Sequence, residues 1–337
     1  MPQANMPKDW EPPAPAWSAR FDKRVTHVVI GYFAVQQRQS QTIGFHHWFH
    51  QCLQQSGAPE RVERGNFTDN QDCYNDVFIA YWTDEGAFER WRSSDIFRNW
   101  WDAAERKTET QGYWCEILRV PVERLETLAS SESQDGVSAA APTIEGPIRE
   151  HGYWGGARDR LAASASDDLA TEVESLSGKV VDSHGQRLQI RPPHNLCLLR
   201  SAQNWSACQG EEREVYTQKV HPVLQQGMRY LVENPEESGC CSCRFMDETS
   251  VAGEVQDKSF GMVWFLSLEH LETWAKTHPT HLAIYGEFMA MVERFNFQTA
   301  LQLWHEGVVV EAQHAHFEYV NCHSATGLLP YFDSVSI

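Results

Sequence analysis

The sequence predicts an α+β fold built from a duplicated ferredoxin-like unit, in which helices flank antiparallel sheets. Two observations lead to this prediction. The order strand, helix, strand, longer helix, strand occurs once in each half of the 337 residues, and segments of the second half align with segments of the first. Residues 130–143, which are small, polar or proline and show no periodicity, separate the two halves.

The first half begins after a proline-rich segment, residues 1–20, which is predicted to be an extended arm because proline fixes the backbone and removes hydrogen-bond donors. The apolar, β-branched run that starts near Val25 predicts a buried strand. Apolar residues at helical spacing then predict a helix over 43–53. The remaining elements of this half are a strand over 75–82, a helical segment over 84–101 and strand-like residues 112–129.

The second half repeats this order in recognisable residues. Residues 260–278 align with residues 77–95, so that Trp274 falls on Trp91. Residues 301–310 align with 111–120, which places Trp-His-Glu over Trp-Cys-Glu. Two amphipathic helices are predicted here, over 211–232 with a kink or new start at Pro222 and over 279–296; strands over 305–313 and 316–322 are predicted to form a hairpin.

These elements divide the chain into four parts: an N-terminal arm (1–20), a first ferredoxin-like half (21–130), a linker (131–147), and an insertion followed by a second ferredoxin-like half (148–337).

Charge and composition restrict the kind of partner. The formal net charge of −18 argues against nucleic acid or an anionic membrane as the main partner, since both require a basic surface. No stretch approaches the roughly 20 apolar residues of a transmembrane helix, the first residues lack a signal peptide's apolar core, and nine scattered cysteines suit a reducing compartment. We therefore expect a cytoplasmic protein that binds a small molecule. The 13 Trp, 16 Phe and 10 Tyr suit a large flat ligand, but core packing is the better explanation of this composition.

The two halves differ in histidines that could carry chemistry. His305 stands where the first half has Cys115, and His323 lies in a segment whose first-half counterpart is a serine run. A neutral imidazole is a common ligand of haem iron, and a second histidine can carry protons near neutral pH. The alternative is that both are ordinary hydrogen-bonded side chains.

Other possible metal ligands are explained better by structure than by chemistry. His46 and His50 lie four residues apart, but no third ligand accompanies them, so a solvated helix face is expected. Cys240, Cys241 and Cys243 lack a second ligand pair and are predicted to pack in a turn. The HPTH segment, 278–281, is interpreted as the start of a helix.

Five segments, in the same order along the chain, resemble the haem-containing aldoxime dehydratases, the phenylacetaldoxime dehydratase family. They read REHGYWGGARDR, LLRSAQNW, HPTHL, LQLWHE and FEYVNCHSATG. The resemblance covers about residues 31–327 and implies haem b, active in its ferrous form, dehydration of aldoximes to nitriles, and a homodimer. The sequence does not distinguish aryl from alkyl aldoximes.

The resemblance also implies roles for single residues. His305 is expected to be the proximal iron ligand and His323 the distal acid-base catalyst. Ser201 and Arg160 are expected to hold the oxime hydroxyl beside His323, and Glu126 to lie near the haem. Ser324 and Ala202 depart from the proline and glycine usual in the family at these positions, which affects the pocket's shape without removing a reacting group.

Two other functions remain open from the sequence. A related ferredoxin-like haem protein that acts on peroxide or chlorite would also use a distal arginine. A non-catalytic haem-binding protein would bind haem reversibly and would not need Ser201.

Overall fold

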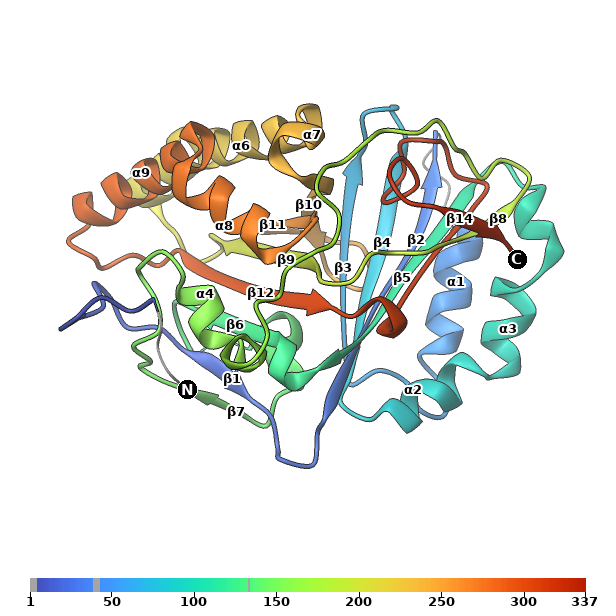
Figure 1. Cartoon of the computed structure of the whole chain (residues 1–337), viewed down its shortest axis with the longest axis horizontal. Helices are drawn as coiled ribbons and strands as arrows, with labels where there is room; N and C mark the ends of the chain where they lie inside the picture. Colours follow the sequence, from blue (N-terminus) through green and yellow to red (C-terminus); the bar gives the residue numbers. More distant parts are fainter. Residues whose placement is uncertain (1–4, 39–42, 133) are drawn as a thin grey trace.

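The computed structural model describes residues 5–38, 43–132 and 134–337. Its main feature is one large, curled antiparallel sheet (Figure 1). The sheet's strands in chain order are β2 (His27–Gln37), β3 (Arg61–Thr68), β4 (Tyr74–Trp82), β5 (Gly112–Pro121), β6 (Leu125–Ala129), β8 (Arg187–Ile190), β9 (Leu196–Asn204), β10 (Cys240–Thr249), β11 (Val255–Phe265), β12 (Gln302–Val310), β13 (Ala315–Val320) and β14 (Ser334–Ser336). The predicted α+β class, with helices flanking antiparallel strands, is confirmed.

Four neighbouring strands of the sheet come from the first half, in the order β5-β2-β4-β3. The helices α1 (Ile43–Cys52), α2 (Glu85–Arg92) and α3 (Asp95–Trp101) cover one face of them. The core between these layers is aromatic: Phe49 stacks on Phe78 with ring centroids 4.2 Å apart, and Trp48 stacks on Trp101 at 5.5 Å. Much of the chain's aromatic content is thus used for packing in this half.

The next four strands, in the order β10-β11-β9-β12, come from the second half. Figure 1 shows the helices α6 (His221–Glu233), α8 (Leu268–Thr277) and α9 (Pro279–Arg294) over these strands. The helix predicted over 211–232 is divided into α5 (Gly210–Val215), a π-helical turn over Tyr216–Val220, and α6. The residues at both junctions, Val215, Tyr216, Val220 and His221, keep right-handed helical angles, so no new helix starts at Pro222; it directly follows the π-helical turn, where the helix changes type without a break.

The two halves are joined through the backbone and exchange their outer strands. Between them, β3 and β10 pair over only three residue pairs, from Arg64–Thr249 to Asn66–Asp247. Beyond β12 the sheet ends in β6, a strand of the first half, and beyond β5 it continues with β13 and then β8 and β14. Each half therefore completes the other's sheet.

This exchange contradicts the predicted hairpin of residues 305–313 and 316–322. β12 pairs with β9 and β6, whereas β13 pairs with β5 and β8. A 3-10 turn, η6 (Ala312–His314), separates the two strands. Apolar periodicity identifies a strand but not its partner, because a hydrogen-bonded ladder needs only a free edge.

The ends and the predicted linker are held against the sheet. β1 (Ser18–Arg20), at the end of the expected arm, pairs with β7 (Thr143–Glu145). The segment expected to be a linker contains the 3-10 helix η3 (Gly136–Ala140), in which Val137 is fully buried. This segment is therefore part of the core rather than a solvated tether.

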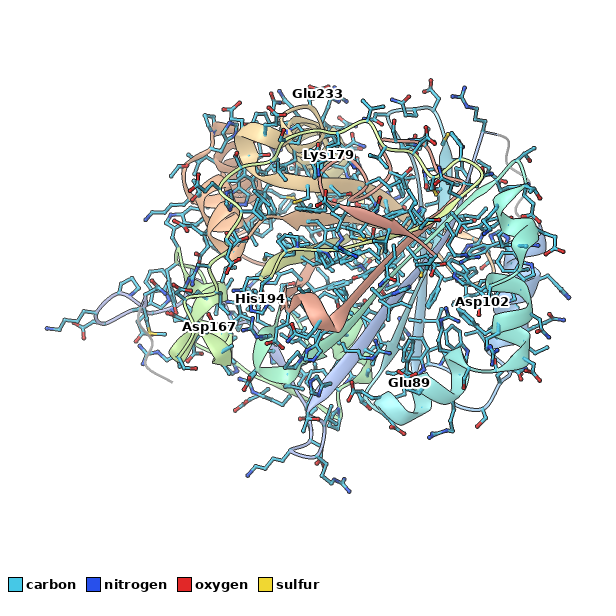
Figure 2. All side chains as sticks on the ribbon, turned by 45° about the vertical axis from the view of Figure 1, so that its right-hand side comes forward. Glu89, Asp102, Asp167, Lys179, His194 and Glu233 are labelled. Carbon is cyan, nitrogen blue, oxygen red and sulfur yellow. The ribbon has the colours of Figure 1, made fainter. Side chains whose placement is uncertain are left out.

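Some of the negative charge lies at the surface, as Figure 2 shows for Glu89 in α2, Asp102 after α3 and Glu233 at the end of α6. Within the described residues, no helix is long and apolar enough to cross a lipid bilayer.

Candidate active site

A row of side chains on the second half's strands forms the floor of the candidate site. His305 on β12 lies directly opposite Ser201 on β9, Ser201 opposite Gly261 on β11, and Gly261 opposite Phe245 on β10. Cross-strand partners project to the same face of a sheet, so these residues form one row. A Cβ atom on Gly261 would lie 3.0 Å from Sδ of Met228 on α6, so the row faces the helical layer.

This face is incompletely packed at the row. Ser201 and His305 are half-buried, whereas their neighbours Ala202, Trp304 and Glu306, which project to the reverse face, are buried. Polar groups at the floor of such an open face can bind a ligand that enters between sheet and helices.

Glu126 on β6 and Arg160 on α4 (Gly156–Arg160) converge on His305. Oε1 of Glu126 lies 3.0 Å from Nε2 of His305. Arg160 donates from Nε to Oε2 of Glu126 at 2.7 Å, and its Nη2 lies 3.0 Å from Nε2 of His305. Gly307 makes room for the carboxylate, since a Cβ there would meet Glu126 Oε1 at 2.6 Å.

The short helix α4 depends on its glycines to present Arg160. Gly155, its N-cap, has φ of 95°, a left-handed conformation that a residue with a Cβ rarely adopts. Arg160 is fixed further by donating from Nη1 to the backbone oxygen of Glu150 at 2.5 Å. The paired glycines of the HGYWGGARDR insertion thus set the position of a cationic side chain.

Charge stabilises the ionised form of Glu126. Burial alone raises the pKa of this carboxyl, but the charge of Arg160 and the interactions with His305 outweigh burial and lower the pKa to about 2. Nε2 of His305 therefore lies between an arginine, which only donates, and a carboxylate, which only accepts. A protonated Nε2 can donate to Glu126 and an unprotonated one can accept from Arg160, so either protonation state keeps a partner.

A further histidine, which the sequence interpretation took as the start of a helix, faces the same helical layer. His281 lies in the first turn of α9, in line with the inward-facing Ile284 and Phe288. Its ring packs edge-on against Trp274 at 4.8 Å between centroids and lies 6.0 Å from Trp154, six residues before Arg160.

His281 has the properties of a ligand for iron. Its Nδ1 is buried and makes no hydrogen bond of standard geometry among the described residues, and the ring interacts with the backbone of Ala275. Burial lowers its pKa, which favours the neutral imidazole that a metal requires. The signal in the sequence was the HPTHL match itself, but a proline two residues earlier is equally typical of a helix start.

His323 lies elsewhere. Its Nε2 is 2.9 Å from Oδ2 of Asp69, and its backbone N–H donates to Gln36. No hydrogen bond or ion pair of the described residues joins His323 to Ser201, Arg160 or His305. The structure thus brings four of the five expected site residues together and separates His323 from them.

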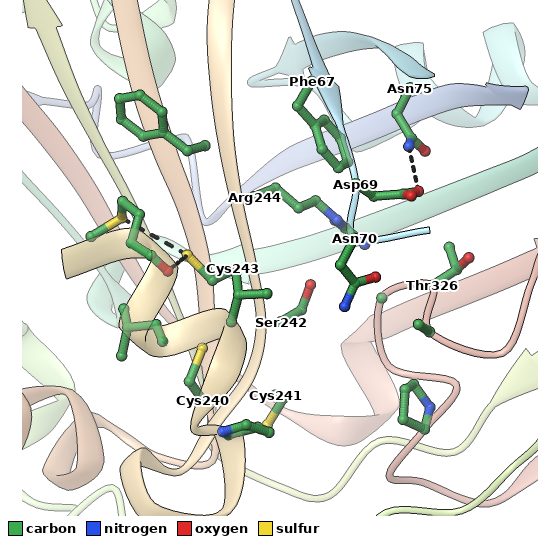
Figure 3. Close-up of a pocket in the computed structure, with 18 of the residues that line it drawn as sticks. Phe67, Asp69, Asn70, Asn75, Cys240, Cys241, Ser242, Cys243, Arg244 and Thr326 are labelled. Atoms are coloured by element: carbon green, nitrogen blue, oxygen red, sulfur yellow. Dashed lines mark hydrogen bonds between the residues drawn. The ribbon is translucent and has the colours of Figure 1, made fainter. Parts of the chain in front are cut away.

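Asp69 lines a cavity of about 430 Å³ between the diverging strands β3 and β10 (Figure 3). Cys240, Cys241 and Cys243 line its other side from β10, so these thiols pack as expected but in a strand rather than a turn. His46, expected on a solvated face, instead contacts the buried carboxylate of Asp76 at 2.8 Å.

Comparisons with known proteins identify the chain's relatives. The phenylacetaldoxime dehydratase of Bacillus sp. (strain OxB-1) is 38% identical over 339 aligned residues, 99% of this chain and 96% of that protein. The aliphatic aldoxime dehydratase of Pseudomonas chlororaphis is 35% identical over 332 residues, 96% of this chain and 93% of that protein.

A solved structure agrees over nearly the whole fold. A crystal structure of an aldoxime dehydratase in complex with butyraldoxime matches with a TM-score of 0.89 and 32% identity, covering 96% of this chain and 91% of that chain. The family model for haem-containing dehydratases matches residues 31–328. The chain therefore belongs to the family of haem-containing dehydratases.

Proposed function

We propose that the chain is a haem-dependent aldoxime dehydratase, which converts R-CH=N-OH to a nitrile and water. The observation that carries this proposal is the convergence of Arg160 and Glu126 on His305, in one row with Ser201 on an open face of the sheet. The names of relatives that this chain matches over almost its full length support the same activity.

We further propose that His281 on α9 would hold the haem iron, on the side of the sheet to which Ser201 and His305 project. Three features support this position within the C-terminal half: the buried Nδ1 of His281, the pKa of this ring, which burial lowers, and the partial exposure of Ser201 and His305. Ferrous haem iron would supply a site for the oxime nitrogen and electron density for breaking the N–O bond.

This assignment differs from the sequence expectation of His305 as iron ligand and His323 as catalyst. Arg160 and Ser201 were expected beside the acid-base histidine, and the histidine beside them is His305. We therefore propose His305 as the acid-base group. His323, through Asp69, is proposed to fasten the segment after β13 to the hairpin of β3 and β4.

The protein's own residues perform the proton transfers. Hydroxide is a poor leaving group, so the oxime oxygen must be protonated before the N–O bond breaks, and His305 as imidazolium is placed to donate that proton. Ser201 and Arg160 orient the hydroxyl and stabilise developing charge. Water leaves with the oxygen.

His305 then completes the reaction as a base. Its neutral form accepts the hydrogen bound to the oxime carbon, which closes the C≡N bond and restores the imidazolium. Glu126 is proposed to hold the ring's orientation and to stabilise its positive charge, as a buried carboxylate beside a catalytic histidine does. One histidine thus serves first as acid and then as base.

The architecture proposed from the sequence also has support. In each half the strands follow the order fourth, first, third, second, with a helical segment after the first and after the third, which supports a duplicated ferredoxin-like unit. The nine unpaired cysteines support a cytoplasmic location. A homodimer remains a proposal, and sedimentation of the purified protein tests it.

The function is tested by purifying the protein with haem, recording ferric and ferrous spectra, and adding phenylacetaldoxime under a reductant. Nitrile formation is the expected result. Turnover of peroxide or chlorite without nitrile formation would favour the peroxidase or chlorite alternative. Reversible haem binding without turnover of any of these would favour a haem-binding protein.

A further inference from the structure

We infer that Arg200 is a positioning residue, which fixes His305 and Ser201 from the reverse face of the sheet. The inference rests on the proposed function, since it concerns the residues that hold the oxime. Arg200 immediately precedes Ser201 on β9 and lies opposite Glu306 on β12. Its side chain therefore projects from the face opposite to the one that carries Ser201 and His305. It is fully buried.

The guanidinium of Arg200 contacts both neighbours of His305 along β12. Its carbon lies 4.8 Å from the ring centroid of Trp304, and Nη1 lies 3.9 Å from Oε1 of Glu306. One guanidinium group therefore touches the residues on either side of His305. It belongs to Arg200, the residue directly before Ser201. A shift of either strand would disturb these contacts.

Residues of the first half and of the predicted linker complete the support. Nη1 of Arg200 donates to the hydroxyl of Tyr81 at 2.7 Å and lies 2.7 Å from Oε2 of Glu63. The Tyr81 hydroxyl donates to Glu306 at 2.8 Å, and the backbone N–H of Val137 donates to Oε2 of Glu306 at 2.7 Å. Side chains of the first half, Tyr81 and Glu63, thus contact β9 and β12 on the face opposite to Ser201 and His305.

Burial limits how Arg200 can move: Nη1 makes its polar contacts, whereas Nε and Nη2 have no hydrogen-bond partner among the described residues. A buried charge that loses its partner cannot be rescued by water, so alternative positions of Arg200 are costly. Small displacements also matter to proton transfer, which requires the donor within hydrogen-bond reach of the oxime oxygen. We therefore expect the network to act on turnover more than on substrate binding.

A second buried arginine provides a matched control. Arg244 forms two hydrogen bonds to Glu116, at 2.6 and 3.0 Å, and this pair is as buried as that of Arg200. Glu116 also accepts from Trp264 and Tyr319, so its surroundings are equally polar. No described contact of Glu116 involves a residue next to Ser201 or His305.

The experiment compares Glu306→Gln with Glu116→Gln in the haem-loaded protein. Glu306→Gln is expected to keep haem content and KM near wild type and to lower kcat about tenfold or more. Glu116→Gln, at comparable loss of thermal stability, is expected to stay within about threefold. Arg200→Lys keeps the charge but loses the planar guanidinium group, and it is expected to lower kcat as Glu306→Gln does.

A spectroscopic readout separates this inference from the proposed function. The C–O stretching band of ferrous haem with carbon monoxide reports hydrogen bonds from the side chains facing the iron. A single band in the wild type that splits or broadens in Glu306→Gln, but not in Glu116→Gln, is expected even if no nitrile forms. Equal effects of both variants on kcat, or an unchanged band in Glu306→Gln, would overturn the positioning role.

Discussion

Nη2 of Arg160 lies 3.0 Å from Nε2 of His305, and the same guanidinium donates to Glu126, which also contacts His305. This relationship supports the proposal that His305 is the histidine that works with Arg160. The sequence expectation had placed Arg160 beside His323, whose ring contacts Asp69 instead.

The first prediction separates the two histidines by turnover. His305→Ala is expected to retain haem and to lower nitrile formation by about 10²- to 10⁴-fold, the usual contribution of a general acid-base group. His323→Ala loses the ring's contacts with Asp69 and with the backbone N–H of Ala325, and it is expected to keep kcat within a few fold, while unfolding at lower temperature. The reverse pattern in an assay of nitrile formation would restore His323 as the catalyst.

The second prediction concerns the three groups that the Arg160 guanidinium contacts at once through its N–H donors. A lysine carries the charge but has a single head group, so it cannot hold Glu126, the Glu150 backbone and the imidazole together. Arg160→Lys is expected to lower kcat/KM by about 10- to 100-fold. Arg158→Lys is the control, because Arg158 lies on the same helix but pairs with Glu272. Equal losses in both variants would refute a specific role.

The third prediction follows from the pKa of Glu126. Because that pKa is lowered from 4.5 to about 2 in the folded protein, the ionised carboxylate stabilises the fold by about 3 kcal/mol at neutral pH. This stabilisation is complete above about pH 4.5 and is lost as the pH falls towards 2. Chemical unfolding at a series of pH values should show this loss, and Glu126→Gln should reduce the slope between pH 4.5 and 2. An unchanged slope would contradict the lowered pKa.

The fourth prediction uses the glycine opposite Glu126. In Gly307→Ala the new methyl group would lie 2.6 Å from Oε1 of Glu126, so the carboxylate must move away from His305. We expect a loss of about 1–3 kcal/mol in unfolding free energy together with lower turnover. In Gly286→Ala on α9 the added methyl group meets nothing within 4 Å, and this variant should be unchanged or slightly more stable. Wild-type stability and turnover in Gly307→Ala would contradict the geometry around Glu126.

Much of the fold followed from periodicity, and much of the site from local motifs. The strands around Phe33, Phe78 and Trp264 and the helical segment around Pro222 were predictable because each depends on its own neighbours in sequence. The exchange of β6 and β13 was not, because a strand's partner depends on which edge is free in three dimensions.

The roles proposed for His281, His305 and His323 could not be predicted from the sequence, for a similar reason. The sequence motifs indicated the site residues His305, Ser201, Arg160 and Glu126. Only the pairing of β9 with β12 shows that His305 and Ser201 lie opposite each other in one row. His281 is hidden in a segment that also has the ordinary features of a helix start, and its Nδ1 is buried only after α9 packs.

The haem absorption spectrum of His281→Ala, beside that of His305→Ala, tests the central assignment most directly. If His281 holds the iron and His305 faces the substrate, His281→Ala will lose haem or change its ferrous spectrum, and His305→Ala will keep the wild-type spectrum. An unchanged spectrum in His281→Ala, with loss of haem in His305→Ala, would contradict the assignment and return His305 to the role of iron ligand.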